Sequence, residues 1–390
     1  MLAAYILTKP ENCINLLVVL LTLTEESPWF AGFLAPSRLF YPQKLGAVSK
    51  ITIKHVAKKA GVSTMTVSRV LNNRPDVAAE TRRRVQEVIE ELGYAPNMAA
   101  RGLKGRSRTL GVVATGIEYY GPSRTLASIE RRANELGLSL LLSLITDPET
   151  ESGEDTLTNL LAHQIEGILW AVPEIGNNRE WLYERMQEID TPVVFLNTEP
   201  RGDISMSAVD NFYGGKLATQ HLVEQGYRHI GIVTGPLSWW EAQQRLEGWR
   251  AVLAEHDMAA DIDKLQSYGD WSPASGEAGL LQLLGQARLL DAVFASNDQM
   301  ALGVLKAAKE VGLSVPDDLA IVGFDDIPES AYFSPPLTTI KQGLTEMGAT
   351  TVNMLYESIE SREIGEENSP CVAWITPQLI VRKSSINIKR

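Results

Sequence analysis

Hydrophobic positions beyond residue 108 are grouped in short, nearly continuous runs separated by amphipathic stretches. Four runs come first: TLGVVAT (109–115), LSLLLSLI (138–145), GILWAV (167–172) and PVVFLN (192–197). Three more follow further along the chain: HIGIVTG (229–235), DAVFAS (291–296) and LAIVGFD (319–325). Short, uniformly apolar runs are typical of parallel strands that are buried on both faces.

Helical periodicity in the intervening segments completes two βα series. Helices are predicted at 123–137, 152–163 and 178–188, and then near 211–226, 239–256 and 297–312. Two successive βα series predict an α/β core of two doubly wound parallel-sheet lobes. Ligands of such folds bind at the carboxyl ends of the strands, here in the cleft between the lobes.

A shorter, purely helical pattern precedes this core. Thr52 is a suitable N-cap for a first helix, in which Val56, Ala57 and Ala60 form one apolar face. Gly61 then provides a turn, because glycine adopts a positive φ without steric cost.

A second helix follows over 64–71, capped by Ser63, with Val67, Val70 and Leu71 pointing inward. Its other side presents Thr64, Met65, Ser68, Arg69 and Asn72. A helix that exposes its N-terminal residues in this way can enter the major groove of DNA. The pattern therefore predicts an N-terminal all-α helix-turn-helix DNA-binding domain.

The pattern after the second helix extends this domain toward the core. A third helix over 79–92 has core spacing at Val85, Val88, Ile89 and Leu92. Its Arg82, Arg83 and Arg84 either contact phosphates or form a solvated face. Pro96 and Asn97 begin a helix of at most two turns, which is too short to be stable alone and is expected to order on binding.

The charge distribution supports DNA binding by the N-terminal part. The 390-residue chain has a net charge of −12, the wrong sign for contact with a phosphate backbone. Residues 50–108, however, carry 13 Lys and Arg against 5 Asp and Glu, whereas residues 109–390 carry 20 against 40. A basic module attached to an acidic body fits a nucleic-acid partner for the module alone.

Candidate chemistry for a metal centre or for catalysis is absent from the sequence. Cys13 and Cys371 lie at opposite ends, and the five histidines form no H-x-x-x-H pair. There is no phosphate loop, no G-x-S-x-G elbow and no G-x-G-x-x-G motif after a strand. Asp325 and Asp326 are adjacent, so their side chains normally diverge. We expect no metal, no cofactor and no enzymatic activity.

Residues 1–48 receive no functional assignment. The apolar run INLLVVLLTL (14–23) is shorter than the about 20 residues that span a bilayer. Its flanks are poor for a signal peptide, because only Lys9 supplies a positive charge before it. We interpret the segment as an upstream extension from a start codon assigned too early, with the working protein beginning near Val48. No membrane partner is expected.

Motifs in both parts of the chain occur in one consistent order. The basic module contains VAKKAGVSTMTVSRVLN (56–72) and TRRRVQEVIEELGYAPNMAARGL (81–103). The body contains VDN (209–211), TGP (234–236), RLEGW (245–249), GDWS (269–272), SNDQMALG (296–303), VGFDD (322–326) and PPLTTIKQ (335–342). From about Lys50 to Ser385 the chain thus resembles the LacI/GalR family of bacterial transcriptional regulators. The resemblance implies a helix-turn-helix module, a hinge helix and a periplasmic-binding-protein-like sugar-sensing core.

The resemblance implies a set of DNA contacts. Thr64 and Met65 occupy the positions that read bases, and Arg69 occupies the position that commonly contacts guanine. Leu103 corresponds to a leucine that enters the minor groove at the operator centre. The other implied contacts are Thr52, Ser63, Thr66, Ser68, Asn72, Asn97 and Ala100. Ala78 departs from the serine cap that the family commonly has, at a cost of about 1 kcal/mol to the third helix.

The resemblance also implies an effector site in the cleft. Its residues are Tyr119, Asp147, Asn197, Glu241, Arg245, Trp271, Asn297, Asp325 and Gln342. Arginine, asparagine and aspartate bind ring hydroxyls, and an indole face stacks on sugar C–H groups. Taken singly, Trp271 also fits a core position and Asp325 also fits a turn, but their combined order favours the cleft.

Departures from the family pattern bear on the ligand. Trp239-Trp240 and Glu241 replace small residues, and Gln243 stands where some sugar-responsive members have a second arginine. Asp147 stands where another member has a cationic residue in its cleft. The additional aromatic and acidic residues indicate an uncharged and larger saccharide, and they argue against phosphorylated sugars and carboxylates.

Together these observations predict five segments. They are an extension (1–48), a helix-turn-helix domain (50–95), a hinge and linker (96–107), an N-terminal lobe (108–209 plus 342–376) and a C-terminal lobe (210–341 plus 377–388). The predicted protein is a cytoplasmic repressor, nucleoid-associated when bound, that binds a pseudo-palindromic, double-stranded operator as a homodimer and responds to a small-molecule effector. The alternative is a periplasmic sugar-binding transport receptor, which would account for residues 14–23 but not for residues 60–72.

Overall fold

The structure is a computed structural model that describes residues 51–71, 74, 76–94, 107–148, 153–175, 178–287, 289–366 and 369–386. The chain divides into two compact units, Met1–Pro96 and Asn97–Arg390. The predictions for the extension 1–48, for Asn72 and for the hinge residues Asn97, Ala100 and Leu103 lie outside the described residues.

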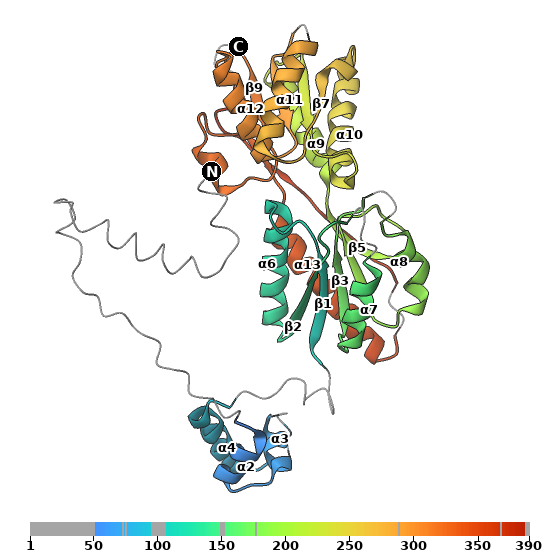
Figure 1. The fold of residues 1–390 in the computed structure, drawn as a ribbon, viewed down its shortest axis with the longest axis vertical. Coiled ribbons are helices and arrows are strands. Elements are labelled where there is room, and N and C mark those ends of the chain that lie inside the picture. The colour runs from blue at the N-terminus through green and yellow to red at the C-terminus, as the bar shows by residue number, and fades with distance from the viewer. Residues whose placement is uncertain are drawn as a thin grey trace, which may run out of the picture. The chain divides into compact units, whose positions relative to one another are not determined.

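The described part of the first unit is helical, as the sequence pattern predicts (Figure 1). Its helices are α2 (Ile53–Ala60), α3 (Thr64–Leu71) and α4 (Ala79–Leu92). Gly61 ends α2 with a φ of 65°, and the Ser63 hydroxyl accepts a hydrogen bond from a first-turn amide of α3 at 3.1 Å. Val56, Val67 and Val85, one from each helix, are fully buried in a shared core.

Helix α4 begins without a side-chain cap. Its N-cap residue is Ala78, whose methyl group accepts no hydrogen bond from the first-turn amides. The first N–H groups of a helix have no intrahelical partner, and the N-cap side chain supplies none at α4. The start of α4 is therefore less stable than a serine-capped start would be.

The first lobe of the second unit is built on a six-stranded parallel sheet, in the order β11-β5-β4-β3-β1-β2. Its strands are β1 (Thr109–Ala114), β2 (Ser139–Leu144), β3 (Gly167–Ala171), β4 (Val193–Leu196), β5 (Ser205–Val209) and β11 (Val372–Ile375). Helices α6 (Tyr120–Glu135) and α13 (Leu344–Glu363) cover one face. Helices α7 (Glu154–Ala162) and α8 (Glu180–Arg185), with the 3-10 turn η1 (Met186–Glu188), cover the other.

Strand β2 corrects one sequence prediction. LSLLLSLI predicted a strand buried on both faces, but β2 is the outermost strand of its sheet, and Leu142 and Leu144 are 42% and 47% exposed. An apolar run indicates affinity for burial without indicating the position of the strand in the sheet. An outermost strand has one neighbour and is covered less completely than the centre.

The second lobe has a four-stranded parallel sheet, in the order β7-β6-β8-β9. Its strands are β6 (Ile230–Thr234), β7 (Gln266–Tyr268), β8 (Ala292–Ala295) and β9 (Ala320–Val322). Helices α9 (Asn211–Glu224) and α10 (Trp240–Glu255) pack on one face, and α11 (Pro273–Gln286) and α12 (Asp298–Glu310) pack on the other. The 3-10 turn η2 (Ile262–Leu265) leads into β7.

The C-terminal part of the chain belongs to both lobes. After β9, the 3-10 turn η3 (Pro328–Tyr332) leads to β10 (Thr339–Lys341), which pairs antiparallel with β12 (Gln378–Ile380). Between these two strands the chain forms α13 and β11 of the first lobe, so that the red α13 lies among teal and green elements in Figure 1. This crossing brings residues that are distant in sequence to the junction of the lobes.

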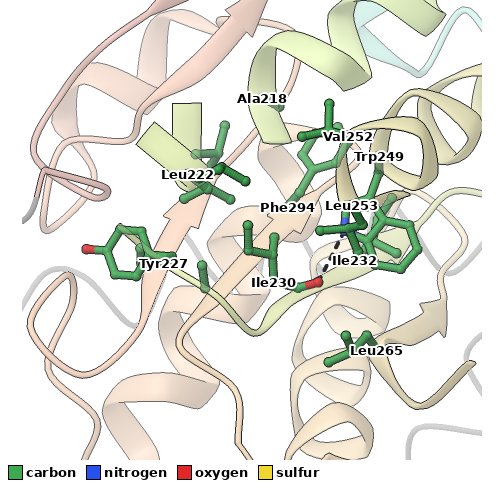
Figure 2. Packing of buried hydrophobic residues seen from close by; sticks show 14 of the residues in the cluster. Ala218, Leu222, Tyr227, Ile230, Ile232, Trp249, Val252, Leu253, Leu265 and Phe294 are labelled. Carbon is green, nitrogen blue, oxygen red and sulfur yellow. Dashed lines mark hydrogen bonds between the residues drawn. The ribbon is translucent and has the colours of Figure 1, made fainter. Parts of the chain in front are cut away.

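An aromatic core fixes α10 on the second sheet. Figure 2 shows Trp249 of α10 beside Ile230, Ile232 and Phe294 of the strands. The Trp249 indole N–H donates a hydrogen bond to the Ile230 carbonyl at 3.2 Å, which satisfies a fully buried polar group. The position of α10 matters because its N-terminal end carries several of the predicted site residues.

Candidate functional site

The described part of the first unit exposes one side of α3. Thr64 and Met65 at its start are exposed, with 61% of the Met65 surface accessible, while Val67 and Val70 face the core. Arg69 lies on the exposed side and forms an ion pair with Asp76 at 3.4 Å. The structure thus leaves the predicted base-reading side chains free of core packing.

Other predicted DNA contacts also shape the fold. Thr52 is the N-cap of α2, and its amide donates to His55 Nδ1 at 3.0 Å. The Ser63 and Thr66 hydroxyls lie 2.9 Å apart at the start of α3, and Ser68 is partly exposed. Their positions permit contacts with a phosphate backbone, and the roles assigned to them stay predictions.

The second unit contains a cavity between its lobes. The cavity has about 890 Å³ of space not filled by protein atoms, part of it open to solvent. Ala114, Ala171 and Asn197 line it from the ends of strands in the first lobe, and Asn297 and Asp325 line it from the second. This is where two doubly wound lobes bind ligands.

Eight of the nine predicted effector residues line this one cavity: Tyr119, Asn197, Glu241, Arg245, Trp271, Asn297, Asp325 and Gln342. Asp147 does not. It lies on the loop after β2, is exposed and is not among the residues that line the cavity, so its assignment to the site stays a prediction.

Arg245 of α10 is the central cation of the cavity. It is 5% exposed, donates from Nε to Asn211 at 2.8 Å and from Nη1 to the Ser296 carbonyl at 2.5 Å. Its guanidinium lies 3.8 Å from the centre of the Phe324 ring. Burial lowers the pKa of Arg245, and the charge of Asp325 at 4.0 Å opposes that shift. The guanidinium is therefore held rigidly, with part of its binding capacity already used.

Asp325 lies opposite this guanidinium in an unusual backbone conformation. Its φ is 116°, and the Gln342 side-chain amide donates a hydrogen bond to its carboxylate. Burial raises the pKa of Asp325 to about 6, and Arg245 and Gln342 limit the shift. Asn197 and Trp271 also have positive φ values, of 44° and 71°. Such strained conformations cluster at functional sites.

Three aromatic rings form one wall of the cavity. Trp239 lies between Tyr119 and Trp271, with both pairs of ring centres 6.0 Å apart and edge-on. Gly235 lies behind Trp271, where a Cβ atom would be 2.1 Å from the indole ring. This wall offers both apolar surface and an indole face to a ligand.

Asn297 has a structural task in addition to its place in the cavity. Its side-chain oxygen accepts from the Met300 amide at 2.7 Å and so caps α12, and its amide nitrogen donates to the Trp271 carbonyl at 3.0 Å. The same side chain thus connects α12 to the loop that carries Trp271, one of the three rings of the aromatic wall. A ligand contact with Asn297 would use its remaining hydrogen-bonding capacity.

Comparison with known proteins shows the family to which this chain belongs. Residues 52–97 match "Bacterial regulatory proteins, lacI family", and residues 219–385 match "Periplasmic binding protein-like domain". The HTH-type transcriptional repressor PurR of Histophilus somni (strain 129Pt) is 35% identical over 335 residues, which cover 85% of this chain and 98% of the relative. The chain belongs to the LacI family of bacterial regulatory proteins.

Two solved structures of LacI-family relatives are similar to this chain in fold. The lac repressor dimer bound to operator and the anti-inducer ONPF has a TM-score of 0.76 and 31% identity, covering 86% of this chain and 99% of that chain. The complex of the transcriptional regulator CelR with cellobiose has a TM-score of 0.63 and 31% identity, with the same coverage. These likenesses confirm the predicted fold class and disfavour the transport-receptor alternative, which has no use for a LacI-type DNA-binding domain.

The LacI-family cavity also has an apolar side that the sequence prediction missed. Tyr120, Leu126 and Ile129 of α6 and Leu344 and Met347 of α13 line it. Pro122, Thr125, Leu126 and Ile129 follow the i, i+3, i+4, i+7 spacing of one helix face, which is the signal that was available. That spacing predicts that this face of α6 is buried, but it does not indicate whether other protein residues or a ligand bury it.

The described part of the chain contains neither a candidate metal site nor a candidate membrane-spanning helix. No group of three His, Cys, Asp or Glu side chains could hold a metal ion there. No described helix is long and apolar enough to cross a membrane.

Proposed function

We propose that this LacI-family protein is a cytoplasmic repressor that binds a pseudo-palindromic operator as a homodimer. A neutral saccharide in the cavity between the lobes controls its affinity for the operator. The observation that carries the proposal is the exposed start of α3, where Thr64, Met65 and Arg69 point away from the helical core. A helix that presents its first residues in this way fits the major groove.

Dimerisation follows from the way such modules read DNA. One recognition helix contacts only a few base pairs, and a two-fold dimer places two of them on successive turns of the duplex. The lac repressor structure to which this chain is similar is described as a dimer bound to operator. The net charge of the basic part, with 13 Lys and Arg against 5 Asp and Glu, supports phosphate contacts for each protomer.

A saccharide is the ligand class that the cavity chemistry supports. One guanidinium, two carboxylates, four side-chain amides and four aromatic rings line it, namely Arg245, Glu241, Asp325, Asn197, Asn297, Gln299, Gln342, Tyr119, Tyr120, Trp239 and Trp271. Hydroxyl groups both donate and accept hydrogen bonds, and the C–H face of a sugar packs on an indole. The similar CelR structure is a complex with cellobiose. We infer no cofactor and no catalytic role.

The ligand acts by binding the operator-competent and the operator-free states with different affinities. A ligand with equal affinity for both states would change nothing. Because the cavity wall contains residues of both lobes, a ligand that fills it changes the relative stability of their arrangements. Either sign of control, induction or co-repression, is compatible with this linkage.

Fluorescence anisotropy with DNA fragments from the region around the protein's own gene tests the proposal. We expect binding at low salt whose affinity falls steeply as salt increases, because bound Lys and Arg side chains displace counterions from DNA. Adding neutral disaccharides, cellobiose among them, should shift the affinity at fixed salt. Absence of binding to every fragment at low salt would favour a binding protein without a regulatory role.

A further inference from the structure

The N-terminal end of α10 reaches from the second lobe into the first. The Trp239 backbone forms an isolated antiparallel bridge with Ile175 of the first lobe. Trp240 is 9% exposed and belongs to an apolar core cluster whose other members all come from the first lobe. Its ring centre lies 6.3 Å from that of Trp374 on β11. These contacts fix the position of the next residue, Glu241, between the lobes.

Glu241 is buried in the cavity wall with an unused hydrogen-bond acceptor. It is 8% exposed, and its Oε2 atom has no hydrogen-bond partner among the described residues. The first lobe presents Arg179 and Asn197 to this carboxylate, and Arg245 faces it from its own helix. Burial raises the pKa of Glu241, and a backbone hydrogen bond, the charges of Arg245 and Arg179 and a hydrogen bond from Asn197 oppose this increase. A buried acceptor without a partner is uncommon in a native protein and requires an explanation.

Trp271 supplies a complementary unused donor. Trp271 lines the same cavity and is 6% exposed, and its buried Nε1–H has no partner among the described residues. An unpaired acceptor and an unpaired donor therefore occur in one wall. One ligand that carries both a donor and an acceptor satisfies them together, as a sugar ring with its hydroxyls does.

The charges near Glu241 favour a neutral donor over a cationic one. Arg179 is 1% exposed, and its Nε and Nη1 groups have no partner among the described residues, so its charge is available to balance the carboxylate. A ligand ammonium group would add a third cation where two, Arg179 and Arg245, already lie buried. A hydroxyl satisfies Oε2 without this addition.

We propose that Glu241 is the specificity-determining residue of the cavity: it accepts a hydrogen bond from one hydroxyl of a neutral saccharide, while Trp271 Nε1 donates to another oxygen of the same molecule. The proposal rests on the proposed function and specifies what the effector must carry. It explains why a glutamate occupies a wall that is otherwise mostly aromatic and apolar.

Isothermal titration calorimetry on the full-length protein tests the proposal. The probes are cellobiose, lactose, maltose and trehalose, with glucosamine, glucose 6-phosphate and hypoxanthine as chemically different compounds. We expect a neutral disaccharide to bind best, and Glu241→Ala to weaken its binding by about 10- to 100-fold, because a hydrogen bond to a charged group is lost. Glu241→Gln should weaken sugar binding less, because the amide oxygen of glutamine can still accept a hydrogen bond from the hydroxyl.

Glu247→Ala is the matched control. Glu247 is on the same helix, is exposed and lies outside the cavity, so that its removal should leave sugar binding unchanged. A second control uses single-deoxy derivatives of the best-binding sugar. One deoxy derivative should bind the wild type more weakly than the parent sugar does. The same derivative and the parent sugar should bind Glu241→Ala equally well. The hydroxyl that this derivative lacks is then the one that donates to Glu241.

The outcomes separate this proposal from the proposed function. Equal sugar affinity of wild type and Glu241→Ala, with operator binding intact in both, would overturn the role of Glu241 alone. Tighter binding of glucosamine, glucose 6-phosphate or hypoxanthine than of every disaccharide would overturn the neutral-hydroxyl assignment. Failure of every sugar to bind the wild type would contradict the saccharide part of the proposed function, and with it this inference. Circular dichroism and operator binding without ligand verify that each variant is folded.

Discussion

Gly235 has no side chain, and this leaves the space that the Trp271 ring occupies in the aromatic wall of the cavity. The residue follows β6, and a Cβ atom there would lie 2.1 Å from the Trp271 ring, which is far inside van der Waals contact. Trp271 in turn is held by Asn297, which donates to its carbonyl. The ring is therefore positioned by the absence of a side chain on one side and by a helix cap on the other.

We expect Gly235→Ala to displace the Trp271 ring, to weaken sugar binding at least about 10-fold and to lower the free energy of unfolding by about 1–3 kcal/mol, as overpacking does. Titration calorimetry and urea denaturation measure the two effects. Gly285→Ala in α11, where no atom lies within 4 Å of an added Cβ, should be neutral or slightly stabilising. Unchanged sugar binding by Gly235→Ala would show that Trp271 is not part of the ligand site.

Asp325 gives the protein a pH dependence of predictable sign. Burial raises its pKa from 3.8 to about 6, so the folded protein binds this proton more tightly than the unfolded chain does. Its contribution to stability is complete below the unfolded pKa and is lost as pH rises through about 6. Relative to Asp325→Asn, the wild type should gain about 1 kcal/mol of unfolding free energy as pH falls from about 7.5 to about 5.

Urea denaturation of both proteins across this pH range measures the difference. Asp263→Asn, an exposed position on η2, should reproduce the wild-type pH profile and serves as the control. Parallel profiles for wild type and Asp325→Asn would mean that the carboxylate is not buried in the folded protein in solution.

The helices differ in whether a side chain caps their N-terminal end. Asp210, Ser272 and Asn297 cap α9, α11 and α12 with side-chain hydrogen bonds, whereas Ala78 leaves α4 uncapped. The cap residues at the first three helices also fix where each helix begins relative to the cavity. At α4 the missing cap affects only the helical core that supports α3.

Ala78→Ser should therefore stabilise the first unit by about 0.5–2 kcal/mol, because its hydroxyl can accept from a first-turn amide. Hydrogen exchange of the α4 amides in the full-length protein measures the gain without requiring global unfolding. Ala79→Ser, one position inside the helix, offers no cap and should slightly destabilise α4. Equal protection of α4 in Ala78→Ser and in the wild type would show that solvent already satisfies the first turn.

At the scale of the second unit, contacts across the lobes include an aromatic pair, Trp240 with Trp374. Trp240 begins α10 in the second lobe, and Trp374 lies on β11, which is an outer strand of the first sheet. Aromatic pairs contribute about 0.5–1.5 kcal/mol beyond their buried area. The pair thus couples the stability of the two lobes.

A double-mutant cycle of Trp240→Ala and Trp374→Ala should give a coupling energy of about 0.5–1.5 kcal/mol in the free energy of unfolding. A control cycle that combines Trp240→Ala with Val372→Ala, on the same strand as Trp374, should give a coupling energy near zero. Additive effects of the two tryptophan substitutions would show that this contact does not connect the lobes in solution.

Much of the fold followed from local patterns. The apolar runs at β1, β3, β4, β6, β8 and β9 are strands, and the turn at Gly61 and the cap at Ser63 stand where the pattern put them. Elements with a weaker period, such as β5, β7, α11 and α13, were not predicted. The outer position of β2 was not predicted either, because strand order depends on pairing between distant segments.

The sequence by itself determined the class of protein and the two βα series, and eight of the nine effector residues predicted from it line the cavity. These depend on short-range spacing and on motifs whose order is visible along the chain. Only the tertiary structure decided that α6 and α13 form the apolar side of the cavity and that Glu241 Oε2 is buried without a partner among the described residues. Those properties depend on which surfaces meet in space, and burial and hydrogen-bond satisfaction arise only when distant segments pack together.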